Sequence, residues 1–147
     1  MLACGGALIV HLPEQGIVAT GDLMVAPIPF AFGSNPADWV GALDSIVALH
    51  PRNLLPGHGP VMRDLGYLKT VRGGLERIRD ETGQAVAGGD SLGAVLERVT
   101  LDDLRLRLTG DEKWLNYMFR SFFVRPAVRR AHEQAGGASL ARATSPR

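Results

Sequence analysis

Three features of the sequence carry side chains that could do chemistry. The first is Asp22, which follows the short apolar run of residues 17–20 and Gly21. The second is His58, within the Pro-Gly-His-Gly-Pro segment 56–60. The third is a group of arginines towards the C-terminus, Arg120, Arg125, Arg129 and Arg130.

Asp22 and His58 gain meaning as a pair. Taken separately, Asp22 is typical of a turn after a strand, and His58 of a loop. Both, however, stand where an expected strand passes into a loop, which is the usual place for functional groups on an α/β scaffold. Gly57 and Gly59 allow a close approach of the backbone to a metal or substrate. Since carboxylate and imidazole groups bind zinc and similar first-row metals, the pair predicts a metal site.

Other residues with metal-ligand chemistry are less well placed. His11 lies in the middle of an expected strand and His50 on the apolar face at a helix end, so both are expected to be packed. Cys4 has suitable chemistry, but its place near the N-terminus argues against a role. Because a catalytic zinc generally needs three protein ligands, we expect only weak zinc binding by the isolated chain.

The charges are unevenly distributed. Residues 1–50 contain no Lys or Arg, whereas residues 51–147 contain all 16 basic residues against 11 acidic ones. The C-terminal arginines are spaced along expected helices and form no basic run, which is typical of a solvated face. Nucleic-acid binding is therefore not expected.

The elements that must position the two candidate ligands follow from periodicity and turn residues. Apolar runs at residues 7–12 and 17–20, joined by a turn, predict a hairpin whose second strand stops at the candidate aspartate. Asn35 as an N-cap, followed by proline, predicts a helix over residues 36–50. A minimal strand over residues 53–55 then leads to the candidate histidine.

The chain after about Asp64 has the 3–4 spacing of apolar residues that indicates amphipathic helices. The expected breaks and helices are a break at residues 87–89, helices over 92–99, from about 100 and from about Asp111, and a last helix opened or kinked by Pro126 that ends near Gln134. We therefore expect a first domain over residues 1–86, a helical extension over 87–135 and a disordered tail over 136–147.

Residues 17–22 (Ile-Val-Ala-Thr-Gly-Asp) and 54–60 (Leu-Leu-Pro-Gly-His-Gly-Pro) together resemble the C-terminal half of the metallo-β-lactamase-fold hydrolases. In that family, a strand ending in Gly-Asp supplies an aspartate that bridges two metals. A later Pro-Gly-His-Gly turn supplies the last histidine ligand of the second metal. The resemblance, which covers about residues 5–80, implies that Asp22 and His58 bind zinc. It also implies an α/β fold: the C-terminal half of an αββα sandwich, followed by a helical C-terminal extension.

The sequence departs from that family in its remaining ligands. The principal motif, His-x-His-x-Asp-His, is absent, and a further histidine of the family would fall at about Ala3. The resemblance thus implies a truncated hydrolase, whose relatives use metal-activated water on a small-molecule ester, lactone, amide or thioester. As an isolated chain it should be inactive or weakly active. The alternative is a non-catalytic remnant or interaction module that pairs with itself or with a partner chain.

The expected hairpin is apolar at nearly every position, so both faces of its sheet need covering. The helix over residues 36–50 and the one from about Asp64 can cover one face. In the family, the sheet of the N-terminal half covers the other, and here the aromatic helix that carries Trp114 and Phe123 could fold over in its place. We expect exposed apolar surface, with self-association or a partner chain.

Composition narrows the class of protein. Hydrophobic residues make up 46% and charged residues 21% of the 147, which is typical of a globular domain. No apolar run reaches the roughly 18 residues of a membrane span, and the N-terminus lacks the pattern of a secretory signal. One cysteine cannot form an internal disulfide. The expected location is therefore the cytoplasm.

Overall fold

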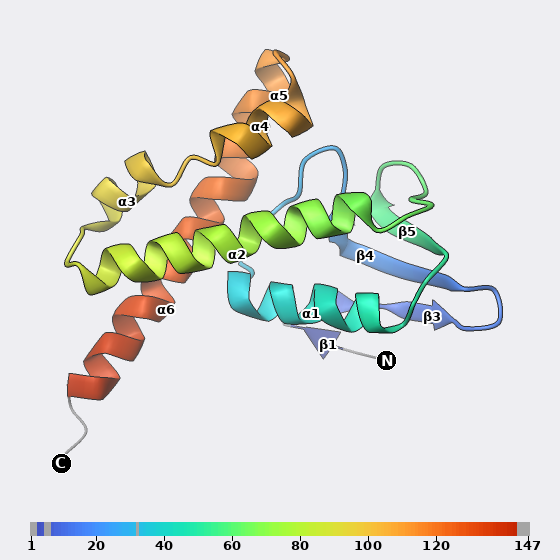
Figure 1. The fold of residues 1–147 in the computed structure, drawn as a ribbon, viewed down its shortest axis with the longest axis horizontal. Helices are drawn as coiled ribbons and strands as arrows, with labels where there is room; N and C mark the ends of the chain where they lie inside the picture. Colours follow the sequence, from blue (N-terminus) through green and yellow to red (C-terminus); the bar gives the residue numbers. More distant parts are fainter. Residues whose placement is uncertain (1–2, 5–6, 32, 144–147) are drawn as a thin grey trace.

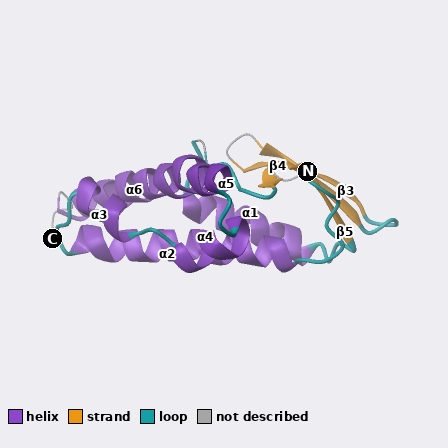
Figure 2. Ribbon diagram, turned by 90° about the horizontal axis from the view of Figure 1, so that it is seen from above, coloured by secondary structure: helices purple, strands orange, loops and turns teal. Residues whose placement is uncertain are grey.

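The computed structural model describes residues 3–4, 7–31 and 33–143. The chain is a small α/β domain with a three-stranded mixed sheet at one end and a C-terminal helical region (Figure 1 and Figure 2). The strands are β1 (Ala3–Cys4), β2 (Ala7–Leu8), β3 (Val10–Leu12), β4 (Ile17–Val25) and β5 (Asn53–His58). The helices are α1 (Pro36–Ala48), α2 (Gly66–Ala87), α3 (Leu92–Arg98), α4 (Asp102–Thr109), α5 (Lys113–Met118), the π-helical turn η1 (Phe119–Val124) and α6 (Arg125–Ala143).

The sheet has the strand order β3-β4-β5. Strands β3 and β4 form the predicted antiparallel hairpin, in which Val10 pairs with Ala19. Strand β5 lies parallel to β4, with Val18 opposite Leu54, and α1 makes the crossover between them. Because β4 and β5 are parallel, their carboxyl ends meet at one edge of the sheet.

The expectation that the second strand stops at Asp22 is wrong. Strand β4 continues to Val25, where it pairs with His58. The register shifts at Gly21, whose φ of +51° is readily accessible to glycine, and pairing then resumes. Asp22 therefore lies on an irregular stretch within the strand rather than at its end.

Helix α1 begins as its sequence predicts. The Asn35 side chain accepts a hydrogen bond from the Ala37 N–H at 2.9 Å, and Pro36 opens the helix. Trp39 is buried, and its indole N–H donates to the Leu23 carbonyl of β4 at 3.0 Å. His50, in contrast, is not packed on the apolar face: it is exposed with a φ of +49°, because the chain leaves the helix in a left-handed turn.

The C-terminal helices pack on α1 and α2 rather than across the sheet (Figure 1). Phe119 and Phe123 are fully buried, and the Phe123 ring meets Trp39 edge-on at a centroid distance of 6.3 Å. Trp114 is left 60% exposed. The expectation that this aromatic helix could replace a missing sheet layer is therefore wrong, since its large rings complete the helical side of the core.

Pro126 lies in the first turn of α6, directly after η1. A proline has no N–H to donate to the carbonyl four residues earlier, which here belongs to Phe122. That carbonyl accepts a hydrogen bond from the Ala31 N–H at 2.7 Å instead. The wide turn thus ties the helical region to the loop that follows β4.

The disordered tail expected from residue 136 is also wrong as far as Ala143. Helix α6 continues to that residue, and residues 144–147 lie outside the described part of the chain. Alanine, leucine and arginine are good helix formers, and extending an existing helix avoids the cost of nucleation. These factors outweigh the glycines at positions 136 and 137.

One face of the sheet is apolar and exposed. Val10, Leu12 and Leu55 on this face are 38–50% exposed, as is Leu8 of the adjoining strand β2 at 54%, and we call these four residues the open sheet face. The opposite face, which includes Val18 and Leu54, is buried beneath the helices. The expectation of exposed apolar surface is confirmed, while self-association stays a prediction.

Two neighbouring glycines in α2 test the packing of the helical region. Gly73 has no atom within 4 Å of an added Cβ, so Gly73→Ala should raise the free energy of unfolding by about 0.5–1 kcal/mol through helix propensity. Gly74 is the matched control, because its Cβ would lie 2.6 Å from Leu104 Cδ2. Urea denaturation should show a smaller gain or a loss for Gly74→Ala. A larger gain there would contradict the packing of α4 on α2.

Candidate metal centre

Asp22, on the irregular stretch of β4, and His58, at the end of β5, lie side by side near the carboxyl end of the sheet. The distance from Asp22 Oδ1 to His58 Nε2 is 3.6 Å, although the residues are 36 positions apart in the sequence. The metal site predicted from the sequence requires the two side chains to lie within reach of one ion, and this proximity is confirmed. Their role as metal ligands stays a prediction.

Glycines shape the backbone around the two side chains. A Cβ on Gly57 would collide with the Asp22 carboxylate and would lie 2.8 Å from the Gly21 carbonyl carbon. Gly59 has a φ of +102°, and its Cβ would lie 2.9 Å from Ala26 Cβ. Glycine at position 57 thus lets the Asp22 carboxylate lie against β5 beside His58, and glycine at position 59 lets the chain pass close to Ala26.

A hydrogen-bonded framework holds this edge of the sheet in place. The Ala26 N–H donates to the His58 carbonyl at 3.1 Å, and the Thr20 hydroxyl lies 3.3 Å from the Leu55 carbonyl. From α2, the Tyr67 hydroxyl donates to the Val25 carbonyl at 2.6 Å. Burial raises the pKa of Tyr67, so the hydroxyl keeps its proton and remains a donor.

Sequence reasoning missed the part played by Tyr67. The residue lies in the first turn of α2, 42 positions from the carbonyl that it binds. A tyrosine at a helix start has no sequence pattern that names its partner. Only the packing of α2 beside the sheet reveals the contact.

The candidate ligands are open to solvent. Their side chains are 78% (Asp22) and 68% (His58) exposed, and neither has a hydrogen bond to another residue in the described part of the chain. As an exposed ion pair the two would contribute only about 0–1 kcal/mol. Stabilisation of the fold therefore does not explain why a carboxylate and an imidazole converge here.

The distance between the donor atoms fits a shared metal. At 3.6 Å it is longer than an ordinary charge-assisted hydrogen bond. Two ligands that bind one tetrahedral zinc at about 2.0–2.1 Å stand about 3.3–3.4 Å apart. A shift of a few tenths of an ångström would thus bring both donors into zinc coordination.

The described part of the chain brings no third ligand to this pair. Among residues 3–4, 7–31 and 33–143, no group of three or more His, Cys, Asp or Glu side chains could hold a metal. His11 lies within β3, His50 is exposed in the turn after α1, and the side chain of Cys4 lies outside the described part of the molecule. The donor set fits zinc in kind but supplies half of a tetrahedral shell.

Comparison with known proteins does not assign the chain to a family. No protein-family model matches the chain, and no curated protein matches it. The resemblance to the metallo-β-lactamase fold therefore stays a prediction from the two motifs.

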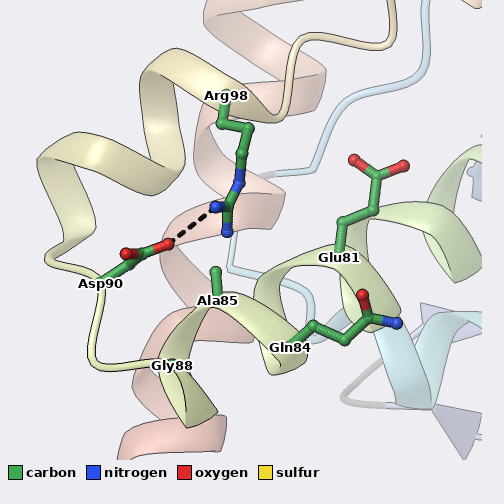
Figure 3. A pocket seen from close by; sticks show the side chains of 6 residues that line it. All are labelled: Glu81, Gln84, Ala85, Gly88, Asp90 and Arg98. Carbon is green, nitrogen blue, oxygen red and sulfur yellow. Dashed lines mark ion pairs between the residues drawn. The ribbon is translucent and has the colours of Figure 1, made fainter.

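Away from the sheet, the described part of the chain has an open hollow lined by charged side chains. One open hollow of about 480 Å³ lies where α2 meets α3, lined by residues that include Glu81, Gln84 and Arg98 (Figure 3). Arg98 is engaged there by Asp90, with 2.8 Å between Nη1 and Oδ2. Arg98, the cationic side chain that lines this hollow, is thus already paired with a carboxylate. We therefore take Asp22 and His58 as the candidate site.

The C-terminal arginines are partly engaged as well. Arg120 lies 3.6 Å from Asp102, and Arg130 lies 3.0 Å from Glu133. Arg125 and Arg129 are exposed on α6.

In the part of the chain that the structure describes, no helix has both the length and the apolar character needed to cross a membrane.

Proposed function

We propose that the protein is the C-terminal half of a metallo-β-lactamase-like hydrolase fold, and that Asp22 and His58 are two of its zinc ligands. The observation that carries this proposal is the 3.6 Å separation of Asp22 Oδ1 and His58 Nε2 on two parallel strands, near their carboxyl ends. The helix-covered sheet with one open apolar face is what such a half would present. The assignment to this family is supported by the resemblance of residues 17–22 and 54–60 to two of its motifs.

The residues at the candidate site would have different roles in metal binding. Asp22 and His58 would hold the metal, while Gly57 and Gly59 keep the space around it clear. Tyr67 would fix the end of β4 from behind. Zinc, when bound, acts as a Lewis acid that polarises a carbonyl group and lowers the pKa of water. With two ligands instead of three, the isolated chain is expected to hydrolyse an ester, lactone, amide or thioester weakly or not at all.

Zinc titration followed by NMR of the imidazole nitrogens tests the metal site directly. The sequence contains four histidines, His11, His50, His58 and His132. We expect zinc to shift the His58 resonances first, because in the described part of the chain it is the histidine that faces a carboxylate at ligand distance. Asp22→Ala should reduce the zinc affinity measured at His58 by about 10-fold or more, since one of two ligands is lost. Equal shifts at all four histidines, or none, would contradict the site.

The open sheet face supports a second candidate function, that of a non-catalytic interaction module. Its side chains are apolar and exposed, and none of the described elements covers them. Exposed apolar patches on soluble proteins often mark binding sites for other chains. Metal stoichiometry separates the two functions, because an interaction module needs no zinc.

A pair of leucine variants tests the interaction surface. Leu12 on the open sheet face is 45% exposed, and Leu106 on α4 is 56% exposed. Leu12→Lys should lower binding of a hydrophobic dye and any self-association, because a charge interrupts the apolar face. Leu106→Lys should leave both unchanged. Equal effects of the two substitutions in dye fluorescence and sedimentation would rule out this face as the interaction surface.

A further inference from the structure

We propose that a second copy of this chain completes the metal site. One zinc ion would be held by Asp22 and His58 of both copies, in a four-ligand site of two carboxylates and two imidazoles. This inference rests on the proposed role of Asp22 and His58 as zinc ligands. It adds the partner and predicts a zinc-dependent dimer.

The number of ligands that zinc requires is the first argument for a second copy of the chain. Structural zinc sites are almost always four-coordinate, and each chain offers two donors 3.6 Å apart. No third His, Cys, Asp or Glu joins them within the described ranges. A two-fold symmetric dimer presents the same patch twice, so two pairs of ligands supply four.

Access allows the second copy to reach the metal. Both ligand side chains are more than two-thirds exposed. Gly57 and Gly59, beside them, are exposed and carry no side chain that could keep another backbone away. A metal held here would therefore face outwards, with half of its coordination shell open to a neighbouring molecule.

The open sheet face leads directly to the candidate site. Leu55 and Gly57 are two residues apart in β5, so their Cα–Cβ directions fall on the same side of the strand. A Cβ on Gly57 would strike the Asp22 carboxylate, which places that carboxylate on the side of the exposed Leu55. Apolar side chains and metal ligands thus form one continuous surface.

The size of this surface explains why zinc is needed. Four exposed apolar side chains are far fewer than the roughly 20–30 residues that each partner contributes to a standard interface. The face alone should give weak association. It is uncharged and hence self-compatible, and four zinc–ligand bonds would add the stabilisation that it lacks.

Sedimentation equilibrium with measured zinc content tests the proposal on the intact chain. In the presence of a chelator we expect a monomer, and with zinc ions alone a species of doubled mass that contains one zinc per two chains. His58→Ala and Asp22→Ala should each remain monomeric in zinc. His50→Ala and Asp111→Ala are matched controls at exposed positions outside the site, and both should dimerise as the unmodified chain does.

The outcomes separate this inference from the proposed function. A monomer with one zinc per chain would overturn the dimer site and leave the metal role of Asp22 and His58 intact. No zinc binding at all would overturn both. A dimer that persists in chelator and in His58→Ala would also overturn the inference, because association would then depend on the open sheet face alone.

Discussion

Phe123→Ala is expected to lower the free energy of unfolding by about 3–5 kcal/mol, the usual cost of truncating a buried aromatic ring. The Phe123 side chain is fully buried. Its ring meets Phe119 and Trp39 edge-on, at centroid distances of 5.5 and 6.3 Å. The substitution therefore opens a cavity where η1 packs on α1. Chemical denaturation followed by circular dichroism measures the effect.

Trp114 provides the control for that measurement. It is larger than Phe123 and lies only nine residues away in the sequence, yet its side chain is 60% exposed and stacks mainly on Tyr117. Trp114→Ala should change stability by less than about 1 kcal/mol. Similar losses for the two variants would mean that the aromatic helix covers some other surface, such as the open sheet face.

Gly57→Ala is expected to lower the zinc affinity about as much as Asp22→Ala does, by about 10-fold or more, while leaving most of the fold intact. The new Cβ would occupy the place of the Asp22 carboxylate and press on the Gly21 backbone at 2.8 Å. The carboxylate must then turn away from His58, and the pair of donors is lost. Backbone crowding should also lower the free energy of unfolding by about 1–3 kcal/mol. Equilibrium dialysis with zinc measures the first effect and denaturation the second.

Gly41 is the matched position for this substitution. It lies in α1, and no atom stands within 4 Å of its added Cβ. Gly41→Ala should retain zinc binding with equal or higher stability, because alanine is the better helix former. Unchanged zinc affinity in folded Gly57→Ala would show that Asp22 does not need its present position to bind metal.

Local features of this protein could be predicted from the sequence. The hairpin, the Asn35 cap of α1 and the break after Ala87 depend on residues within a few positions of one another. Turn chemistry, side-chain capping and the restricted φ of proline act over that same short range. The positions of Asp22 and His58 after expected strands, together with the resemblance of the two motifs, also predicted that these side chains lie close together.

The structure differs from the sequence-based predictions where contacts between distant segments decide the local conformation. Strand β4 runs beyond Asp22 because β5 offers partners as far as His58, and a local reading sees only the Gly-Asp turn signal. His50 is exposed because the chain must turn from α1 into β5. Helix α6 continues past Gly136 and Gly137 because extending an existing helix costs less free energy than nucleating a new one.

The sequence alone determined which residue types could bind metal, and that the strands are apolar on both faces. Only the tertiary structure decided that Asp22 and His58 stand 3.6 Å apart, that Tyr67 braces their strand, and that the aromatic C-terminal helices pack on α1 and α2. The physical reason is that composition sets how much apolar surface must be buried. Which surfaces meet depends on shape and register between segments dozens of residues apart, and here that choice left the Leu12–Leu55 side of the sheet open beside the candidate ligands.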